Sequence, residues 1–421
     1  MKIERTLSIM LFLCALDISV KAQSPTQNYV LSKDVLDVDG THAITTVTYY
    51  DGLNRLEEST YAEGEDMSQN KNRYSENVLS YSANGSIERL QRYGKKNNGT
   101  FGLIDDLTYS YNGNQIKAIS DKAGSLLYNG SFDFKDGANA DVEYFYDANG
   151  ALVKDLNKGI SNIEYDVLGN MKCITFSNGF KTKYIYDAAG NKLRITHESV
   201  VTNTTDYIGN FVLEDGKLSK YLFDGGYCSF DNNQNPSFHY YEKDHLGSVR
   251  MVVNENGTIE QVNHYYPFGG VYGDLSYKGE LQRNKYIGKE FDHMYGLDWY
   301  DHGARMYDAA RVVWDRIDNL GEKNSDISPY LYCHDNAINK FDPDGNDDYF
   351  SNSGQFLFSK GDSPNIYVAN GNNGFVNFNT LDLRRKNNLN TGVRIVGYYA
   401  RKAGVKYNVN GCLLYTSPSP R

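Results

Sequence analysis

Apolar and polar residues alternate over short stretches of this chain, and a turn signal ends most of these stretches. In residues 142–146 and 183–186, at least every second side chain is aromatic or aliphatic. A period of two places such side chains on one face of a β-strand. The repeated stretches show no long amphipathic helix pattern. The alternation therefore predicts an all-β fold of short strands joined by tight turns.

The turns share one motif: a tyrosine, usually an aspartate or asparagine next, then a glycine or asparagine turn and an aliphatic residue. The copies are residues 50–56, 81–87, 111–116, 146–152, 165–171 and 186–193. We expect the Asp or Asn side chain to accept hydrogen bonds from backbone amides, and the glycine to adopt a positive φ. Two short strands and two turns fill about 20 residues, which is the spacing of the later copies. The motif predicts consecutive β-hairpins.

Three stretches depart from this motif. Residues 62–77 and 91–100 predict loops, and the polar residues 23–40 predict a loose leader. The composition otherwise suits strands and turns, with 36 Tyr and 39 Gly but only 8 Pro.

Residues 240–345 contain the densest set of aromatic strands and Gly or Asx turns. The elements predicted here are a hairpin at residues 249–260 that turns at Asn256 and Gly257, a hairpin that joins residues 296–300 to 304–308, and a strand at residues 330–332. Trp299 and Trp314 are expected in the core rather than as ligand platforms.

The motifs of residues 240–345 resemble, in order, the core domain that ends rearrangement-hotspot (RHS) repeat proteins. The tyrosine-aspartate motifs before it resemble the YD repeats of the same family, so the resemblance extends from residue 49 to residue 345. It implies a β-sheet spiral of the kind that winds around a hollow cage, ended by the core domain. It also implies a polymorphic toxin, in which a variable effector follows the core.

Asp318 and Asp342 are the candidate catalytic residues. In some members of the RHS family a matching pair of motifs forms an aspartyl self-protease, and the resemblance places Arg311 at a basic position that holds a carboxylate charged. Two carboxylates that share one proton can activate water and protonate the scissile carbonyl. Asn319 and Asn346 depart from the family pattern, which has Pro and usually Leu there. Turns that end the core are the alternative interpretation.

A second possible constellation, Asp244, His245 and Ser248, is interpreted as a turn. Neighbouring residues on a strand point to opposite faces, so Asp244 and His245 are poorly placed to act together. Gly247 supplies a hinge between two strands.

The two ends of the chain predict segments outside the fold. Residues 1–22 have a basic start, an apolar run and small residues before Gln23, as in a signal peptide; a buried strand or an uncleaved anchor is the alternative. Residues 412–421 read like the translation of a transposase adapter used in sequencing libraries. We exclude them as an artefact and expect the natural protein to continue past Gly411.

The net charge and the cysteine content argue against certain partners and sites. A net charge of −10 and a pI near 5.4 argue against a nucleic-acid partner for the repeats and core. Without the two end segments, three widely spaced cysteines remain, Cys173, Cys228 and Cys333. This odd set predicts no disulfide framework and no zinc site. No cofactor is predicted.

The predicted domains are a signal peptide (1–22), a leader (23–48), YD-type repeats (49–239), the RHS core (240–345), the start of a variable, α+β effector region (346–411) and an adapter artefact (412–421). The implied function is a secreted or surface-exposed carrier of a C-terminal toxin in bacterial competition. A self-processing aspartyl protease and a surface module that binds carbohydrate or protein are the alternatives. The implied partners are the chain's own effector region, an immunity protein and a cell-surface or secretion-system component, with no transmembrane segment after signal removal.

Overall fold

The computed structural model describes residues 20–24, 27–34, 44–64, 68–127, 132–272, 282–318, 327–340 and 342, and beyond these the backbone of four short strands. The contacts divide the chain into two units, Met1–Gly345 and Asn346–Arg421, and each is described by itself. Most of the predicted signal peptide (1–22), much of the region 346–411 and all of residues 412–421 lie outside the described residues. In the described part, no helix is long and apolar enough to cross a membrane.

Two large antiparallel sheets make up most of the first unit, and in both every strand pairs with its neighbours in sequence. The 8-stranded sheet consists of β1 (Val20–Ser24), β2 (Gln27–Asp34), β3 (Ile44–Tyr50), β4 (Leu56–Glu63), β5 (Glu76–Tyr81), β6 (Ile87–Lys95), β7 (Phe101–Asn112) and β8 (Gln115–Asp121). The 13-stranded sheet consists of β9 (Tyr144–Tyr146), β10 (Leu152–Asp155), β11 (Ile160–Tyr165), β12 (Met171–Phe176), β13 (Lys181–Tyr186), β14 (Lys192–Glu198), β15 (Thr202–Ile208), β16 (Phe211–Glu214), β17 (Lys217–Phe223), β18 (Gly226–Phe230), β19 (Pro236–Lys243), β20 (Val249–Asn254) and β21 (Ile259–Val262). We call β1–β21 the wall. The predicted series of consecutive hairpins, with an all-β fold, is confirmed.

The wall's turns follow the predicted chemistry. In the copy at residues 165–171, Asp166 Oδ1 accepts the amides of Leu168 (2.8 Å) and Asn170 (2.9 Å), two and four residues on. Gly169 between them has φ 84°. The same pair of bonds starts from Asp51, Asp147, Asp187, Asp231, Asp244 and Asn254. One turn design therefore recurs along the wall, in places where the sequence motif had not been recognised as well.

The motif's tyrosine links successive repeats. The hydroxyl of Tyr111 donates to the carbonyl oxygen of Ile87 (2.6 Å), and that of Tyr165 donates to Leu152 (2.8 Å). Each acceptor is the aliphatic residue that closes the preceding motif. Because an unpaired carbonyl in the packed interior is destabilising, these bonds fix the spacing between neighbouring hairpins.

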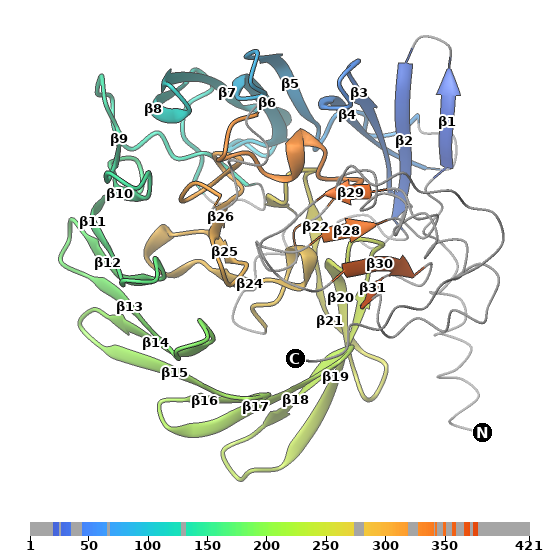
Figure 1. Cartoon of the computed structure of the whole chain (residues 1–421). Coiled ribbons are helices and arrows are strands. Elements are labelled where there is room, and N and C mark those ends of the chain that lie inside the picture. The colour runs from blue at the N-terminus through green and yellow to red at the C-terminus, as the bar shows by residue number, and fades with distance from the viewer. Residues whose placement is uncertain are drawn as a thin grey trace, which may run out of the picture. The chain divides into compact units, whose positions relative to one another are not determined.

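A core segment, of which residues 264–272, 282–318 and 327–340 are described, packs against the concave side of the wall; Figure 1 shows β24–β26 inside the curve of the green and yellow strands. Its elements are β22 (His264–Tyr265), β23 (Val271–Tyr272), β24 (Glu290–Asp292), β25 (Trp299–Asp301), β26 (Met306–Asp308), β27 (Val313–Trp314) and the 3-10 turns η1 (Tyr286–Gly288), η2 (Met294–Gly296) and η4 (Cys333–Asp335). Trp299 and Trp314 are 1% and 2% exposed, so their predicted burial is confirmed. Both hairpins predicted in this region, β20–β21 and β25–β26, are present as well.

Polar contacts join the core segment to the wall. Arg92, on β6, has no exposed side-chain surface and forms ion pairs with Glu76 (2.7 Å) and Asp105 (3.0 Å). Its guanidinium also donates to the carbonyl oxygens of Ala309 and Ala310 in the core segment. Farther along the wall, Lys192 Nζ pairs with Glu290 (2.7 Å) and Asp301 (2.5 Å), both in the core segment. Tyr266 OH donates to the carbonyl of Tyr93, on β6.

The structure corrects four local predictions. The expected leader contains β2, and the loops expected at residues 62–77 and 91–100 begin with the ends of β4 and β6. These polar sequences form strands because backbone pairing with both neighbours does not require an apolar face. The strand expected at residues 330–332 is a turn with a single bridge, Val313 to Leu331, because the left-handed residues of η4 redirect the chain.

The second unit contains one small sheet in the order β29-β28-β30-β31. Its strands are β28 (Asp348–Phe350), β29 (Phe356–Phe358), β30 (Ile366–Asn370) and β31 (Gly374–Asn377). β28 and β30 are parallel, whereas the other pairs are antiparallel. The described part of this unit is therefore β-structure; the helical part expected there lies outside the described residues.

Candidate functional site

The structure brings together the two aspartates singled out from the sequence, through an arginine that the sequence analysis missed. Arg305 Nη2 lies 3.2 Å from Asp318 Oδ2 and 3.3 Å from Asp342 Oδ2. One nitrogen thus contacts both carboxylates, which lie within two hydrogen-bond lengths of each other. The Arg305 side chain is only 6% exposed, and its guanidinium covers the ring of Trp314 at 4.3 Å.

Three separate turns position these groups. Arg305 lies in the turn between β25 and β26, and Asp318 follows β27. Asp342 is fixed through its backbone, because the Nδ1 of the buried His302 donates to its carbonyl oxygen at 2.6 Å. The His302 ring meets the Trp314 ring edge-on, with centroids 4.9 Å apart, so the imidazole is held by packing as well.

The carboxylates of Asp318 and Asp342 lie close enough together to be compared with an aspartyl protease pair. A pair of carboxylates that share a proton can act as acid and base. Arg305 contacts both carboxylates of the pair here. The Asp318 side chain is 30% exposed, so water reaches it more readily than Asp342, which is 14% exposed. Arg305 thus holds the two carboxylates close to each other.

Arg311 lies in a different cluster. Its Nε pairs with Asp308 Oδ2 at 2.7 Å, and its guanidinium lies over the ring of Tyr144 at 4.9 Å. Burial alone would lower the pKa of Arg311, but Asp308 and Asp155 outweigh this effect and raise it. The carboxylate that Arg311 holds is therefore Asp308, and the structure does not bring Arg311 to the aspartate pair. In the sequence, Arg305 stood out only because it lies in a predicted hairpin. Its place in a hairpin does not show which side chains it contacts.

The other constellation considered from the sequence is a turn, as interpreted. Asp244 Oδ1 accepts the amides of Leu246 and Ser248, and Gly247 has φ 90°. Ser248 Oγ accepts the amide of Ile287, and His245 Nε2 donates to the carbonyl of Ile338. Each polar side chain is engaged in holding the backbone.

Residues 28–319 match the teneurin YD-shell family model. The chain belongs to the teneurin YD-shell family. Residues 348–414, in the second unit, match the family model of metallopeptidase toxin 2. A YD shell followed by a toxin-type segment confirms the resemblance to RHS/YD proteins of the polymorphic-toxin type.

Curated relatives of this YD-shell chain are distant and much longer. A tRNA3(Ser)-specific nuclease WapA from Bacillus spizizenii is 28% identical over 262 residues, which is 58% of this chain and 11% of that protein. Salivary gland surface protein 1 from Aedes aegypti is 27% identical over 231 residues, 48% of this chain and 6% of that protein. Among solved structures, a crystal structure of TcdB2-TccC3 aligns with 76% of this chain and 19% of that chain, at 16% identity and a TM-score of 0.49.

The toxin family's name implies a metal, and the matched segment does not fit one. Residues 348–414 contain no histidine and no glutamate, two of the residue types that form catalytic zinc sites. Among the described residues of the chain, no group of three or more His, Cys, Asp or Glu side chains is arranged to hold a metal ion. No metal-dependent step follows from these residues.

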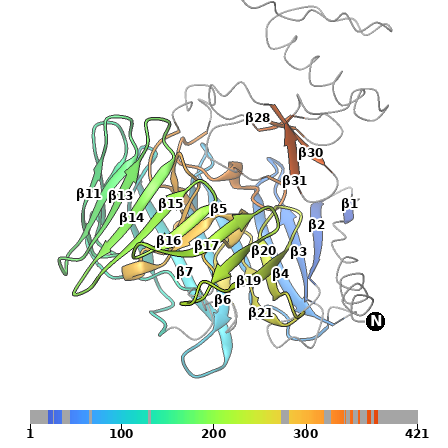
Figure 2. The ribbon, with the colours of Figure 1, turned by 90° about the horizontal axis from the view of Figure 1, so that it is seen from below.

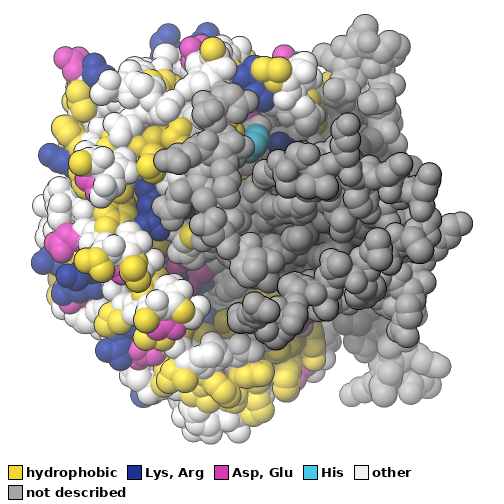
Figure 3. Space-filling model, in the orientation of Figure 1, with side chains coloured by type: hydrophobic (Ala, Val, Ile, Leu, Met, Phe, Trp, Pro, Cys, Tyr) yellow, Lys and Arg dark blue, Asp and Glu magenta, His cyan; other side chains and the backbone are white. Residues whose placement is uncertain are grey.

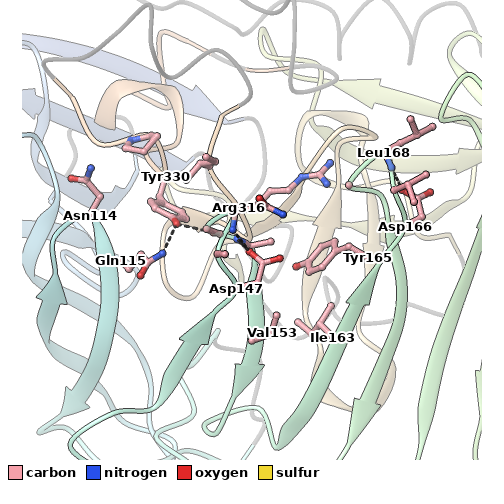
Figure 4. A pocket seen from close by; sticks show the side chains of 18 of the residues that line it. Asn114, Gln115, Asp147, Val153, Ile163, Tyr165, Asp166, Leu168, Arg316 and Tyr330 are labelled. Atoms are coloured by element: carbon pink, nitrogen blue, oxygen red, sulfur yellow. Dashed lines mark hydrogen bonds between the residues drawn. The ribbon is translucent and has the colours of Figure 1, made fainter.

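A groove of about 980 Å³ lies where the turns of the wall meet the chain that follows β27. Figure 4 shows its lining, with Tyr165, Val153 and Ile163 from the wall and Tyr330 from the core segment. Tyr330 OH donates to the carbonyl of Gly150 and accepts from Gln115 Nε2, which holds the two sides together. Arg316 and Ile317, which also line the groove, directly precede Asp318 in the chain.

Proposed function

We propose that this chain is the shell-end part of a secreted or surface-exposed carrier that holds a C-terminal toxin used in competition between bacteria. The observation that carries the proposal is the order of parts: a wall of consecutive hairpins, a core segment packed on its concave side, and then a segment that matches a toxin family. The two Bacillus relatives are named tRNA nucleases, whereas the toxin match here is to a metallopeptidase family. That difference supports a common shell with exchangeable toxins.

Growth of a sensitive bacterium tests this function. The gene's complete reading frame, as it stands in the genome, would be expressed in the cytoplasm beside a version that stops at Gly345. Growth arrest from the complete frame, absent from the shell alone and relieved by a neighbouring immunity gene, would support the carrier. Normal growth with a complete, folded product would overturn the toxin role and favour the surface-binding alternative.

Self-cleavage is a second candidate function, favoured by the proximity of Asp318 and Asp342 around Arg305. The wild-type product is then expected to separate into two fragments near Asn346, and intact mass measurement would locate the cut. The substitution Asp342→Asn should leave the product whole. Asp224→Asn is the matched control, because Asp224 is an exposed turn residue of the wall. An uncut wild-type protein would refute self-cleavage and leave the carrier function standing.

A further inference from the structure

Three polar side chains of the wall form a relay that none of the functions above uses. Ser229 Oγ lies 2.8 Å from His239 Nε2. His239 Nδ1 lies 2.5 Å from Glu260 Oε2. A hydroxyl on one imidazole nitrogen and a carboxylate on the other is the connectivity of a serine hydrolase triad, whatever fold carries it.

The strand register builds this relay. Ser229 is on β18 and His239 on β19, where the paired residues are Ser229 with Ser237 and Tyr227 with His239. Figure 2 shows β17 and β19–β21 lying in one layer at this end of the sheet. The His239 ring stacks on Tyr227, with centroids 4.3 Å apart and an angle of 8° between the planes. Stacking and the bond to Glu260 together fix the ring, which is what a general base requires.

The relay is on the side of the sheet that faces the core segment. On that side Tyr241 OH reaches Gln282, which belongs to the core segment. The opposite side carries exposed aromatic residues, among them Phe211, Tyr221 and Phe238, and apolar side chains gather over these strands in Figure 3. His239 is buried, whereas Ser229 is partly exposed.

A cation lies close to the proposed nucleophile. Lys220, on β17, is the residue directly opposite Ser229 across the strand pair. Its ammonium lies 5.8 Å from the centre of the Tyr227 ring and 3.9 Å from Glu214. Residues opposite each other in an antiparallel pair are neighbours on one face of the sheet, so Lys220 can stabilise negative charge that develops beside Ser229.

A similar set elsewhere in the wall shows what a purely structural version looks like. Thr182 Oγ1 lies 3.1 Å from His197 Nδ1, and His197 Nε2 lies 3.9 Å from Asp292. Thr182 is 0% exposed and His197 is 2% exposed, so no substrate reaches that hydroxyl, and the carboxylate is beyond hydrogen-bond distance. The Ser229 set differs in both respects.

We propose that Ser229, His239 and Glu260 hydrolyse carboxylic esters on the concave side of the shell. Ser229 Oγ attacks the carbonyl carbon while its proton passes to His239 Nε2. The ester C–O bond then breaks, and His239 returns the proton to the leaving alcohol. Water, deprotonated by the same nitrogen, attacks the acyl-serine, releases the carboxylic acid and restores the Ser229 hydroxyl. Glu260 positions His239 and stabilises its charged form.

The test uses the purified full chain, a fluorophosphonate probe and p-nitrophenyl acetate. The wild-type protein should be labelled, with the label mapped to Ser229 by peptide mass spectrometry. The substitution Ser229→Ala should remove the label and lower ester hydrolysis at least about 100-fold, because the nucleophile is lost together with its proton transfer to His239. Ser237→Ala is the matched control, since Ser237 is the strand partner of Ser229 on the same face, and it should change neither readout.

Glu260 needs a readout that a structural role would not move. Glu260→Gln should lower kcat with little change in KM, and Glu260→Asp should restore part of the loss. Circular dichroism would show that each variant is folded. A folded wild-type protein that is not labelled at Ser229, or hydrolysis that persists in Ser229→Ala, would overturn the proposal.

Discussion

Replacement of Arg92 by methionine tests whether buried charge docks the core segment onto the wall. The Arg92 side chain is wholly buried between Glu76 and Asp105, and it donates to the carbonyl oxygens of Ala309 and Ala310. Methionine keeps much of the volume and removes all of these bonds. Both carboxylates then stay in the interior without their cation.

The expected loss of stability is large. Removing one member of a buried ion cluster costs about 3–5 kcal/mol, because the partner left behind is buried and unpaired. Two carboxylates are left here, so we expect a value near the upper end. Whole domains are stable by only about 5–15 kcal/mol, so this single substitution removes a third or more of the total.

The loss of stability caused by Arg92→Met should also increase as the pH rises. Burial raises the pKa of both Glu76 and Asp105, and Arg92 opposes that rise. Without Arg92 the pKa of each carboxyl in the folded state rises further, while in the unfolded chain it stays at about 4. Above that pH the unfolded state gives up its protons and the folded state keeps them, so the variant becomes less stable as pH rises. The deficit should be greater at pH 8 than at pH 5.

Urea unfolding followed by tryptophan fluorescence measures this directly, since both tryptophans, Trp299 and Trp314, are buried in the core segment. A triple variant that adds Glu76→Gln and Asp105→Asn removes the unpaired charges and should recover about 2 kcal/mol or more. The reasoning fails if Arg92→Met unfolds at the wild-type urea concentration at both pH values. It also fails if the triple variant is no more stable than the single one.

Three further predictions concern the wall and its contact with the core segment. Tyr111→Phe removes the bond to the preceding repeat and should lower the unfolding free energy by about 1 kcal/mol, whereas the exposed Tyr221→Phe should not; urea unfolding distinguishes them. Burial opposes ionisation of Glu290, but Lys192 and Arg283, with a hydrogen bond from Tyr207, together outweigh it and lower the pKa of Glu290 to about 2. The stability this adds is complete above about pH 4.3 and is lost as pH falls toward 2, so Glu290→Gln should flatten acid unfolding in that window. Gly226→Ala would place a methyl group 2.1 Å from a main-chain oxygen of β19, and hydrogen exchange should show β18 and β19 losing protection.

The wall could be predicted because its determinants are local. An aspartate that accepts amides two and four residues on, with a glycine of positive φ between them, specifies a turn within five residues. Alternation then assigns the two faces of the next strand, and a short turn makes it the neighbour of the last one. β2 and the end of β6 escaped prediction because their residues are mostly polar, and backbone pairing on both sides forms these strands.

The candidate site could be predicted only in part, because its contacts join distant parts of the chain. The sequence singled out Asp318 and Asp342 as a pair, and the structure places both against Arg305. It could not distinguish Arg305 from Arg311. Both follow short strands of the core segment, and which one meets the pair depends on how β25, β26 and β27 turn relative to one another. That arrangement is fixed by packing around Trp314, not by neighbours in sequence.

A sheet buries its apolar face against another element, and on the concave side of this strip of hairpins that element is the core segment. The contacts between the core segment and the wall are polar as well as apolar. Arg92, on β6, donates hydrogen bonds to the core segment, and Lys192, on β14, forms ion pairs with it. Buried ion pairs of this kind add less to stability than apolar packing would, but they penalise any other docking position heavily. Polar contacts also fix the position of the chain where it leaves the core segment. Arg305 binds the carboxylate of Asp342, and His302 binds its backbone carbonyl. For a wall and a core segment joined in this way, a single docking position matters more than maximal stability.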